Sequence, residues 1–321
     1  MRISAAIEEF QLKSAFAISR GSRNLAAVVS VKVESDGIVG RGECVPYARY
    51  GESPERVLEA VLDLPAPITR GELQEALRPG AARNAVDCAM WDWEAKRFGK
   101  RVWQLAGMPE PRPLPTAYTL SLDEPAVMKR SAQENSFRPL LKIKLGSAND
   151  IERLEAVRSG AAKSSIIVDA NEGWEPEEFR EIIPHLERLR VLMVEQPCPV
   201  EKDDELTGLE YEFDICADES CHDRSSLPGL VGKYSMVNVK LDKTGGLTEA
   251  FALIRKAKTV GFKVMVGCMI GTSLGTAPAT LAAQGAEIVD LDAPLFIADD
   301  REPALVYRDC EVYAPDTRLW G

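Results

Sequence analysis

Charged residues recur at the ends of short apolar segments in the second half of the chain. Lys144, Asp169, Glu195, Asp218 and Lys240 follow one another at intervals of 22 to 26 residues. Each interval fits one strand and one helix, so each residue would close one βα unit. The carboxyl ends of the strands of a parallel barrel share one rim, where barrel active sites lie. We therefore expect the five side chains to converge.

The three acidic residues of this set, Asp169, Glu195 and Asp218, would end neighbouring strands. Carboxylates held close together repel one another unless they are protonated or bridged by a cation. Ligands that are all oxygen favour a hard ion, Mg²⁺ with Mn²⁺ as a substitute, over zinc. Three separate salt bridges at the strand ends are the alternative without a metal.

The two lysines, Lys144 and Lys240, would end the second and sixth strands, on opposite walls of an eight-stranded barrel. A nearby divalent cation favours the neutral amine, which is the form that a general base needs. Two bases on opposite faces of one carbon can remove a proton from one side and return it on the other. The pattern indicates racemisation or epimerisation, and two solvated surface charges are the simpler alternative.

A second acidic pair, Asp290 and Asp292, falls on the eighth expected strand. Strand alternation points both side chains to one face, where they could hold a substrate ammonium. A helix cap or a loop salt bridge is the alternative. A metal for a carboxylate on one side and acids for an ammonium on the other fit a zwitterion as long as a dipeptide.

The segments that carry these residues are short and rich in β-branched residues, and they alternate with helical stretches. This pattern predicts a parallel (β/α) barrel over residues 115–297, with a doubly wound open sheet as the alternative. The eight runs are Thr116–Ser121, Leu140–Leu145, Ser165–Asp169, Leu192–Glu195, Asp214–Asp218, Met236–Leu241, Lys263–Cys268 and Glu287–Asp292.

Residues 1–108 have a different, mixed pattern. A hairpin is expected from residues 26–34 to residues 38–44 across Asp36-Gly37, and Ser53-Pro54 begins a helix. A longer helix should run from Ala81 to Phe98 and end at Gly99. Prolines 109, 111, 113 and 115 then indicate a stiff linker. The irregular tail, about 298–321, is expected to return to this first unit.

Composition narrows the class of protein. The chain has 321 residues, and its 45% of hydrophobic residues is typical of a globular protein. Its net charge of −11 argues against binding to nucleic acids or to anionic membranes, which need a basic protein surface. Neither a membrane-spanning stretch nor a secretory signal is apparent, and seven cysteines show no framework spacing. We expect a cytoplasmic protein, and the oligomeric state stays open.

The ordered motifs resemble the muconate-lactonizing subgroup of the enolase superfamily. They are Lys142-Ile143-Lys144, Asp169-Ala170-Asn171, Glu195-Gln196-Pro197, Ala217-Asp218-Glu219-Ser220 and Asn238-Val239-Lys240. Asn84-Ala85-Val86-Asp87 with Trp91-Asp92 is similar to the signature of that subgroup's N-terminal domain. Asp290-Leu291-Asp292 resembles the mark of its dipeptide epimerases.

The resemblance implies an α+β capping domain, residues 1–108 completed by the tail, on a modified (β/α)₇β TIM-type barrel. It implies Mg²⁺ on Asp169, Glu195 and Asp218, with Lys144 and Lys240 as the acid/base pair and Lys142 as an electrostatic helper. The implied reaction is epimerisation of the C-terminal residue of a dipeptide, most simply L-Ala-D/L-Glu from murein peptides, by 1,1-proton transfer through an enediolate.

Four further residues are assigned on the same grounds. Arg20 aligns with an arginine that meets the glutamyl side chain, and Cys268 stands at the end of strand seven where some relatives carry Ser. Asn171 and Glu219 would lie just behind the metal ligands.

Other readings of the same residues remain. They are another reaction of the subgroup (cycloisomerisation, o-succinylbenzoate synthesis or N-acylamino acid racemisation), a Schiff-base lyase that needs one lysine and no metal, and a barrel that only binds a ligand.

Overall fold

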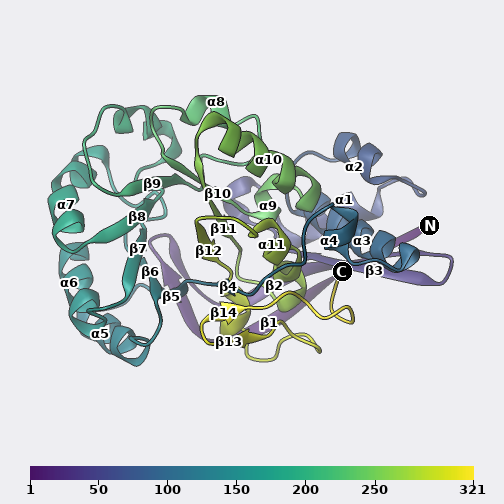
Figure 1. The fold of residues 1–321 in the computed structure, drawn as a ribbon, viewed down its shortest axis with the longest axis horizontal. Helices are drawn as coiled ribbons and strands as arrows, with labels where there is room; N and C mark the ends of the chain where they lie inside the picture. The colour runs from purple at the N-terminus through teal and green to yellow at the C-terminus, as the bar shows by residue number, and fades with distance from the viewer.

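The computed structural model describes residues 1–321 and shows a ring of eight parallel strands beside a smaller α+β unit (Figure 1). The ring follows chain order from β5 to β12, and the Ala117 amide closes it by donating to the Val289 carbonyl at 2.8 Å. The strands are β5 (Tyr118–Leu120), β6 (Leu140–Lys144), β7 (Ser165–Asp169), β8 (Val191–Glu195), β9 (Asp214–Ala217), β10 (Met236–Val239), β11 (Lys263–Gly267) and β12 (Ile288–Asp290).

Strand alternation sorts the barrel residues into two sets. Ile167, Met193, Cys216 and Met236 form one buried apolar cluster. Their immediate neighbours along each strand, such as Val168, belong to the larger cluster that packs against the outer helices. Two residues beyond the inner layer, the same alternation puts charged side chains at the carboxyl end of the ring.

The helices cover the outside of the ring (Figure 1). No α-helix follows β12, which leads instead into the short 3₁₀ turn Ala293–Phe296, so the expected (β/α)₇β barrel is confirmed. The helical segments that follow β8 and β9 are shorter than the pattern predicted: a 3₁₀ segment after β8 and a single helical turn after β9. The connecting elements are α5 (Pro125–Glu134), α6 (Asp150–Gly160), α7 (Pro176–Arg188), the 3₁₀ segment Val200–Leu206, α8 (Leu227–Leu230), α9 (Leu241–Thr244), α10 (Leu247–Val260) and α11 (Ser273–Ala282).

The N-terminal unit is an antiparallel sheet packed on helices. Its elements are β1 (Arg2–Ile18), β2 (Gly21–Ser35), β3 (Ile38–Cys44), α1 (Pro54–Leu62), α2 (Arg70–Ala76), α3 (Ala81–Phe98) and α4 (Val102–Leu105). The predicted hairpin is confirmed, with Asp36 and Gly37 both at positive φ, and so is the cap of α1, where Ser53 accepts from the Arg56 amide. Gly99 ends α3 in the left-handed region, as expected.

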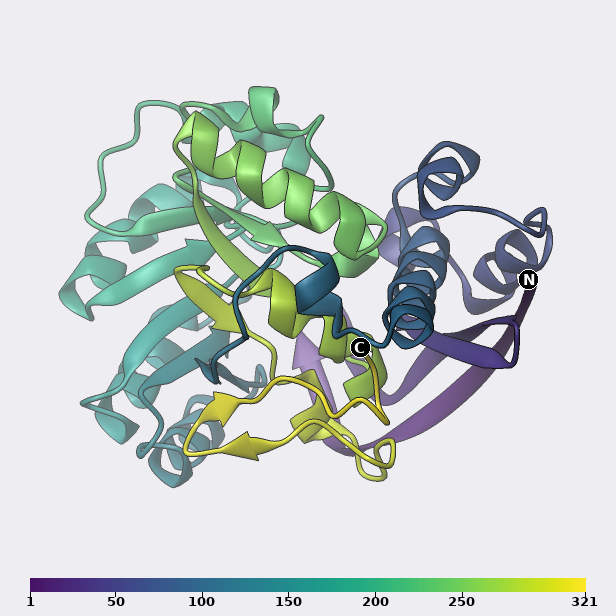
Figure 2. The ribbon, with the colours of Figure 1, turned by 45° about the vertical axis from the view of Figure 1, so that its right-hand side comes forward.

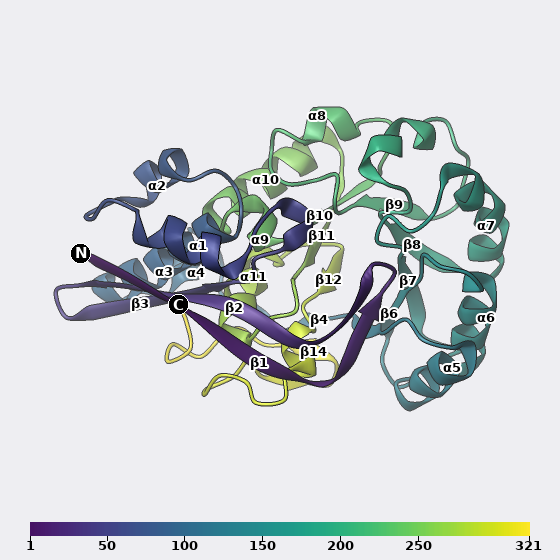
Figure 3. The same cartoon turned by 180° about the vertical axis from the view of Figure 1, so that it is seen from behind.

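The sequence did not reveal β1, because β1 is an edge strand in which only Leu12 is buried, so no buried alternating face marks it. Its far end and the start of β2 form a hairpin that reaches across to the carboxyl end of the barrel near β6 and β7 (Figure 3). The Ala17 amide donates to Ser121 Oγ at 2.7 Å, and Ser19 Oγ donates to the Ala170 carbonyl at 3.3 Å. The hairpin tip therefore covers one side of the barrel mouth.

The tail crosses back over the barrel to the N-terminal unit (Figure 2). On the way β13 (Tyr307–Arg308) and β14 (Glu311–Val312) form a small sheet with β4 (Leu114–Pro115). Trp320 Nε1 then donates to the Cys88 carbonyl at 2.9 Å, within α3.

None of the helices has both the length and the apolar character needed to cross a lipid bilayer.

Polar side chains of α3 join the two units. Asp87 accepts from the Thr248 amide at 3.0 Å and from Thr248 Oγ1 at 2.6 Å, and Asn84 Nδ2 donates to Asp242 Oδ1 at 2.9 Å. Arg83 donates to two backbone carbonyls in the turn after α9. The residues that carry the N-terminal signature therefore fasten this unit to the barrel.

Candidate active site

Three carboxylates stand at the carboxyl ends of adjacent strands. Asp169 ends β7, Glu195 ends β8 and Asp218 directly follows β9; all three are at most 2% exposed. Asp169 and Glu195 are register partners in the β7–β8 pair. Because parallel strands end at one rim, the predicted convergence of these residues is present in the fold.

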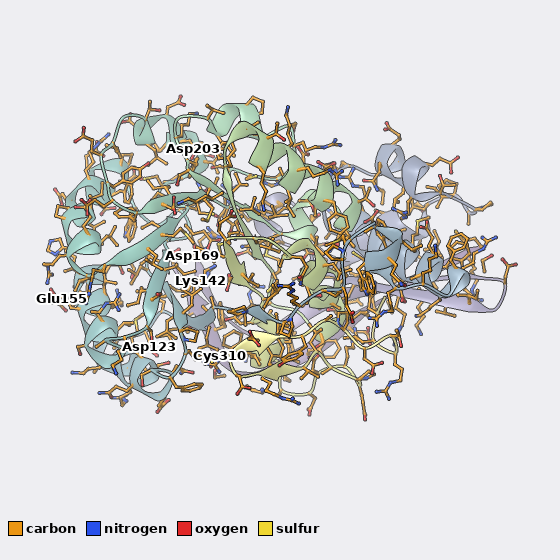
Figure 4. All side chains as sticks on the ribbon, viewed as in Figure 1. Asp123, Lys142, Glu155, Asp169, Asp203 and Cys310 are labelled. Carbon is orange, nitrogen blue, oxygen red and sulfur yellow. The ribbon has the colours of Figure 1, made fainter.

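Lys142 lies at the centre of this acidic group. Its Nζ is 3.0 Å from Asp169 Oδ2, 2.6 Å from Glu195 Oε2 and 2.7 Å from Asp290 Oδ2. Figure 4 shows Lys142 and Asp169 side by side within the ring of strands. Lys142 thus links the acids of β7 and β8 to the acid of β12 across the mouth.

The two expected acid/base lysines occupy separate places around the group. Lys144 Nζ is 2.6 Å from Asp169 Oδ2 and 3.2 Å from Asn171 Oδ1. Lys240 Nζ is 2.6 Å from Asp218 Oδ2. Lys144 ends β6 and Lys240 follows β10, four strands away, and both line one cavity.

The electrostatics of the site differ from residue to residue. Burial raises the pKa of Glu195 to about 7, and the neighbouring Asp169 adds to the shift. Burial acts in the same direction on Asp218, but Lys240 and Lys243 outweigh it and hold its pKa well below the usual range. For Lys240, burial favours the neutral amine, yet Asp218 and Glu195 outweigh burial and raise the pKa.

The acids opposite the three carboxylates come from the end of β12, Asp290, and from the turn that follows it, Asp292, which the sequence had placed on the strand. Asp290 pairs with Lys142, and Asp292 Oδ2 accepts from the Thr119 amide at 2.6 Å. Burial, with the nearby Asp290, raises the pKa of Asp292 to about 7. Cys268 is adjacent, and its thiol donates to the Asp290 carbonyl at 3.3 Å. Both acids and Cys268 line the same cavity as the lysines, as the sequence predicted.

Arg20, expected to be free for a substrate carboxylate, is engaged by the protein. Its guanidinium is 2.7 Å from Glu219 Oε1, 2.7 Å from the Asn171 carbonyl and 3.1 Å from Glu172 Oε2. Arg23, on the same hairpin, lines the cavity too, and its guanidinium lies over the Tyr47 ring at 5.4 Å. Arg20 was predicted from the sequence and Arg23 was not, because the sequence alone does not show which of two arginines three residues apart faces the cavity.

The cavity enclosed by these groups measures about 210 Å³. One part is charged, and the other part is lined by the apolar side chains of Phe16, Ile18, Met269 and Ile270. Tyr47 and Tyr50 enter it from the N-terminal unit, so both units build the wall. The volume and mixed lining are suited to a small zwitterion with a short apolar portion.

Three supporting residues were not predicted. Lys243 Nζ donates to Asp218 Oδ1 at 2.6 Å, Asn238 Nδ2 donates to Glu195 Oε1 at 2.6 Å, and Gln196 Oε1 accepts from the Asp218 amide at 3.0 Å. The spacing of Asn238, two residues before Lys240 on one strand, was the available signal for that residue. Lys243 is on the one-turn helix α9, which brings it back beneath the strand ends.

A divalent cation needs several oxygen ligands around one point. With ammonium groups against the carboxylates, no three acidic, histidine or cysteine side chains surround one point as ligands. Glu195 Oε2 is fully buried, and its close partner is the Lys142 ammonium at 2.6 Å, an ion pair without hydrogen-bond alignment. Buried carboxylates gathered at one rim and neutralised by ammonium groups fit a hard cation, which would compete with Lys142 and Lys240 for the same oxygens.

Two known protein families match this chain, one for each of its units. Residues 2–107 match the mandelate racemase / muconate lactonizing enzyme N-terminal domain, and residues 126–318 match the enolase C-terminal domain-like family. The chain belongs to the enolase superfamily. It is therefore an enzyme, and the relatives described next agree with the expectation of an isomerase.

Two relatives are similar to this chain over nearly its whole length. An L-Ala-D/L-Glu epimerase of Escherichia coli K12 is 43% identical, covering 95% of this chain and 97% of its own. An N-acetyl-D-glutamate racemase of a Pseudoalteromonas species is 40% identical, covering 92% and 95%.

Two solved structures of the superfamily hold ligands. An Agrobacterium tumefaciens member with homology to dipeptide epimerases, with bound sodium and L-Ala-L-Glu, is 49% identical with a TM-score of 0.97, and 99% of each chain is covered. A dipeptide epimerase of Enterococcus faecalis V583, complexed with Mg and L-Leu-L-Tyr, is 27% identical with a TM-score of 0.90, covering 98% and 97%.

Proposed function

We propose that this protein is a Mg²⁺-dependent dipeptide epimerase that interconverts L-Ala-L-Glu and L-Ala-D-Glu. The observation that carries the proposal is one cavity with lysines on opposite walls, lined by Asp218 on one side and by the Asp290/Asp292 pair on the other. The other two buried carboxylates, Asp169 and Glu195, lie beside Asp218 beneath the lining. The E. coli and A. tumefaciens relatives, named for or bound to this dipeptide, support it.

We assign Asp169, Glu195 and Asp218 as the residues that would hold Mg²⁺. The bound cation would supply positive charge against the substrate carboxylate, where negative charge grows as the α-proton leaves. Lys142, next to the same acids, adds to that electrostatic stabilisation.

Lys144 and Lys240 would exchange the α-proton, one from each face of the carbon. In the structure Asp218 and Glu195 hold a proton on Lys240 and raise its pKa. When these carboxylates take another positive partner, that effect weakens and the neutral amine becomes accessible. Removal of the proton by one lysine and its return by the other inverts the carbon.

Substrate orientation follows from the remaining charges. The acids at the end of β12 and in the turn that follows it, Asp290 and Asp292, would take the ammonium of the first residue. Arg23 is the free cation on the hairpin and would take an acidic side chain of the second residue. Arg20 would instead hold the hairpin over the mouth through Glu219 and Asn171, both adjacent to metal-ligand positions.

A second candidate is racemisation of an N-acylated glutamate, favoured by the Pseudoalteromonas relative. The two functions differ in whether the substrate carries an ammonium. We also propose a capping domain of residues 1–108 completed by residues 298–321 on a barrel of 115–297; the contact of Trp320 with α3 supports it. A cytoplasmic location stays a prediction.

The test compares kcat/KM for L-Ala-L-Glu, N-acetyl-L-Ala-L-Glu and N-acetyl-L-Glu. The unblocked dipeptide should react best, and Asp292→Asn should reduce its kcat/KM most, because loss of one partner from a desolvated charge pair costs about 2–5 kcal/mol. Equal values for blocked and unblocked dipeptides would remove the role of Asp292. A preference for N-acetyl-L-Glu would establish the second candidate.

A further inference from the structure

Gln196 occupies an unusual place between two of the proposed metal ligands. It directly follows Glu195 at the end of β8, it is fully buried, and its backbone is left-handed at a φ of 37°. A non-glycine residue in this region is strained and persists only where its surroundings fix it. In this backbone conformation the side chain of Gln196 points towards the carboxyl end of the neighbouring strand, β9.

The side-chain amide is engaged on both sides. Gln196 Oε1 accepts from the backbone amides of Asp218 at 3.0 Å and Ser220 at 3.1 Å. Its Nε2 lies 2.9 Å from Ser220 Oγ and 2.9 Å from Tyr234 Oη, and the Tyr234 hydroxyl donates to Asp203 Oδ1 at 2.5 Å. The amide is therefore locked in one orientation by a buried network.

The backbone of Gln196 completes the connection. Its amide donates to the Cys216 carbonyl at 2.9 Å, and its carbonyl accepts from the Glu172 amide at 2.9 Å. One residue thus ties the loops after β7, β8 and β9 together. The three carboxylates Asp169, Glu195 and Asp218 stand at the ends of these same strands.

We propose that Gln196 is a positioning residue: by holding the Asp218 backbone at a fixed distance from Glu195, it sets how tightly the carboxylates bind a divalent cation. The proposal rests on the metal site of the proposed function. Groups that orient metal ligands from behind typically change metal affinity by about 10–100-fold when they are removed. Gln196 does not line the cavity, so its effect would reach the reaction only through the ligands.

The experiment titrates the full-length protein with Mg²⁺ alone in a calorimeter and measures activity against Mg²⁺ concentration. Gln196→Met, similar in size but without an acceptor, should raise the Mg²⁺ dissociation constant about tenfold. At saturating Mg²⁺ its kcat and its KM for the dipeptide should return close to wild type. Gln196→Glu, which keeps an acceptor oxygen for the Asp218 amide, should lose less.

Controls separate positioning from damage to the fold. Tyr234→Phe removes an outer member of the network but leaves the Asp218 contact, so its Mg²⁺ affinity should stay near wild type. If Gln196→Met does not fold, Gln196→Asn, whose shorter amide cannot reach Asp218, should show the same loss of affinity. Unchanged Mg²⁺ affinity in the folded Met or Asn variant overturns the proposal. Absence of Mg²⁺ binding by wild type overturns the metal site itself.

Discussion

The barrel mouth and the interface between the two units are both rich in buried charge, but they satisfy it differently. At the interface, Asp87 and Asn84 each meet hydrogen-bond partners across the boundary. At the mouth, the buried atoms Glu219 Oε2, Asn238 Oδ1 and Asp290 Oδ1 have no hydrogen-bond partner, and Glu195 Oε2 has only its ion pair with Lys142.

This contrast separates residues that hold the two units together from residues that can take part in the reaction. A buried polar group without a partner destabilises a fold, so proteins retain such groups mainly where a ligand or a reaction uses them. The interface should therefore govern stability with little effect on chemistry, and the mouth should govern chemistry with less effect on stability.

The largest effect is expected at the mouth. Lys240→Ala and Lys144→Ala should each lower the rate of epimerisation by about 10²–10⁴-fold, the usual contribution of a general acid or base. Each variant should still unfold cooperatively in the presence of Mg²⁺. Lys263→Ala is the matched control, because this lysine is exposed and pairs with Asp214 away from the mouth. Normal epimerisation by either variant would exclude a two-base reaction.

The converse effect is expected at the interface. Asp87→Ala leaves the half-buried Thr248 amide without its acceptor, so the free energy of unfolding should fall by about 1–3 kcal/mol. Because Asp87 lies outside the cavity, kcat of the folded enzyme should stay near wild type. Denaturant unfolding and steady-state kinetics, with the exposed Asp63→Ala as control, measure both. A large fall in kcat with unchanged stability would reverse the contrast.

A smaller effect concerns the two hairpin arginines. Arg23→Met should reduce the preference for L-Ala-L-Glu over L-Ala-L-Gln, because an arginine that faces a carboxylate gives a charge-assisted bond. Arg20→Met should instead lower kcat/KM for both dipeptides alike, since Arg20 binds the protein and not the side chain. The opposite pattern in kcat/KM would return the substrate contact to Arg20.

The smallest effect is a pH dependence of stability at the interface. Burial raises the pKa of Asp242 above its usual range. The folded protein then holds a proton that the unfolded chain releases, so this contribution to stability falls as pH rises from the unfolded pKa through the folded one. Asp242→Asn should weaken that fall in unfolding midpoints between pH 4 and 8. An identical pH profile in the variant would contradict a raised pKa.

Sequence periodicity predicted the barrel because its strands obey one simple rule. Apolar β-branched runs such as Ser165–Asp169 are buried on both faces, and a charged residue at the end of each run marks the rim. Helix α3 was equally clear because Gly99 marks its end. Strand β1 was not predicted because this edge strand lacks a buried face.

The sequence could predict which residues belong to the site, but it could not predict all of the ion pairs and hydrogen bonds between them. Strand register fixed which residues converge, but whether a guanidinium is free or engaged depends on contacts between distant segments, as for Arg20 with Glu219. The same holds for Gln196, whose role appears only when the loops after β8 and β9 lie together.

The most direct measurement is the fate of the α-protons of L-Ala-L-Glu incubated with the enzyme and Mg²⁺ in D₂O, followed by proton NMR and mass spectrometry. We predict formation of L-Ala-D-Glu with one deuterium at the glutamyl α-carbon, none at the alanyl α-carbon, and no exchange when EDTA is present. Absence of glutamyl exchange, or exchange that persists at full rate in EDTA, would contradict the account.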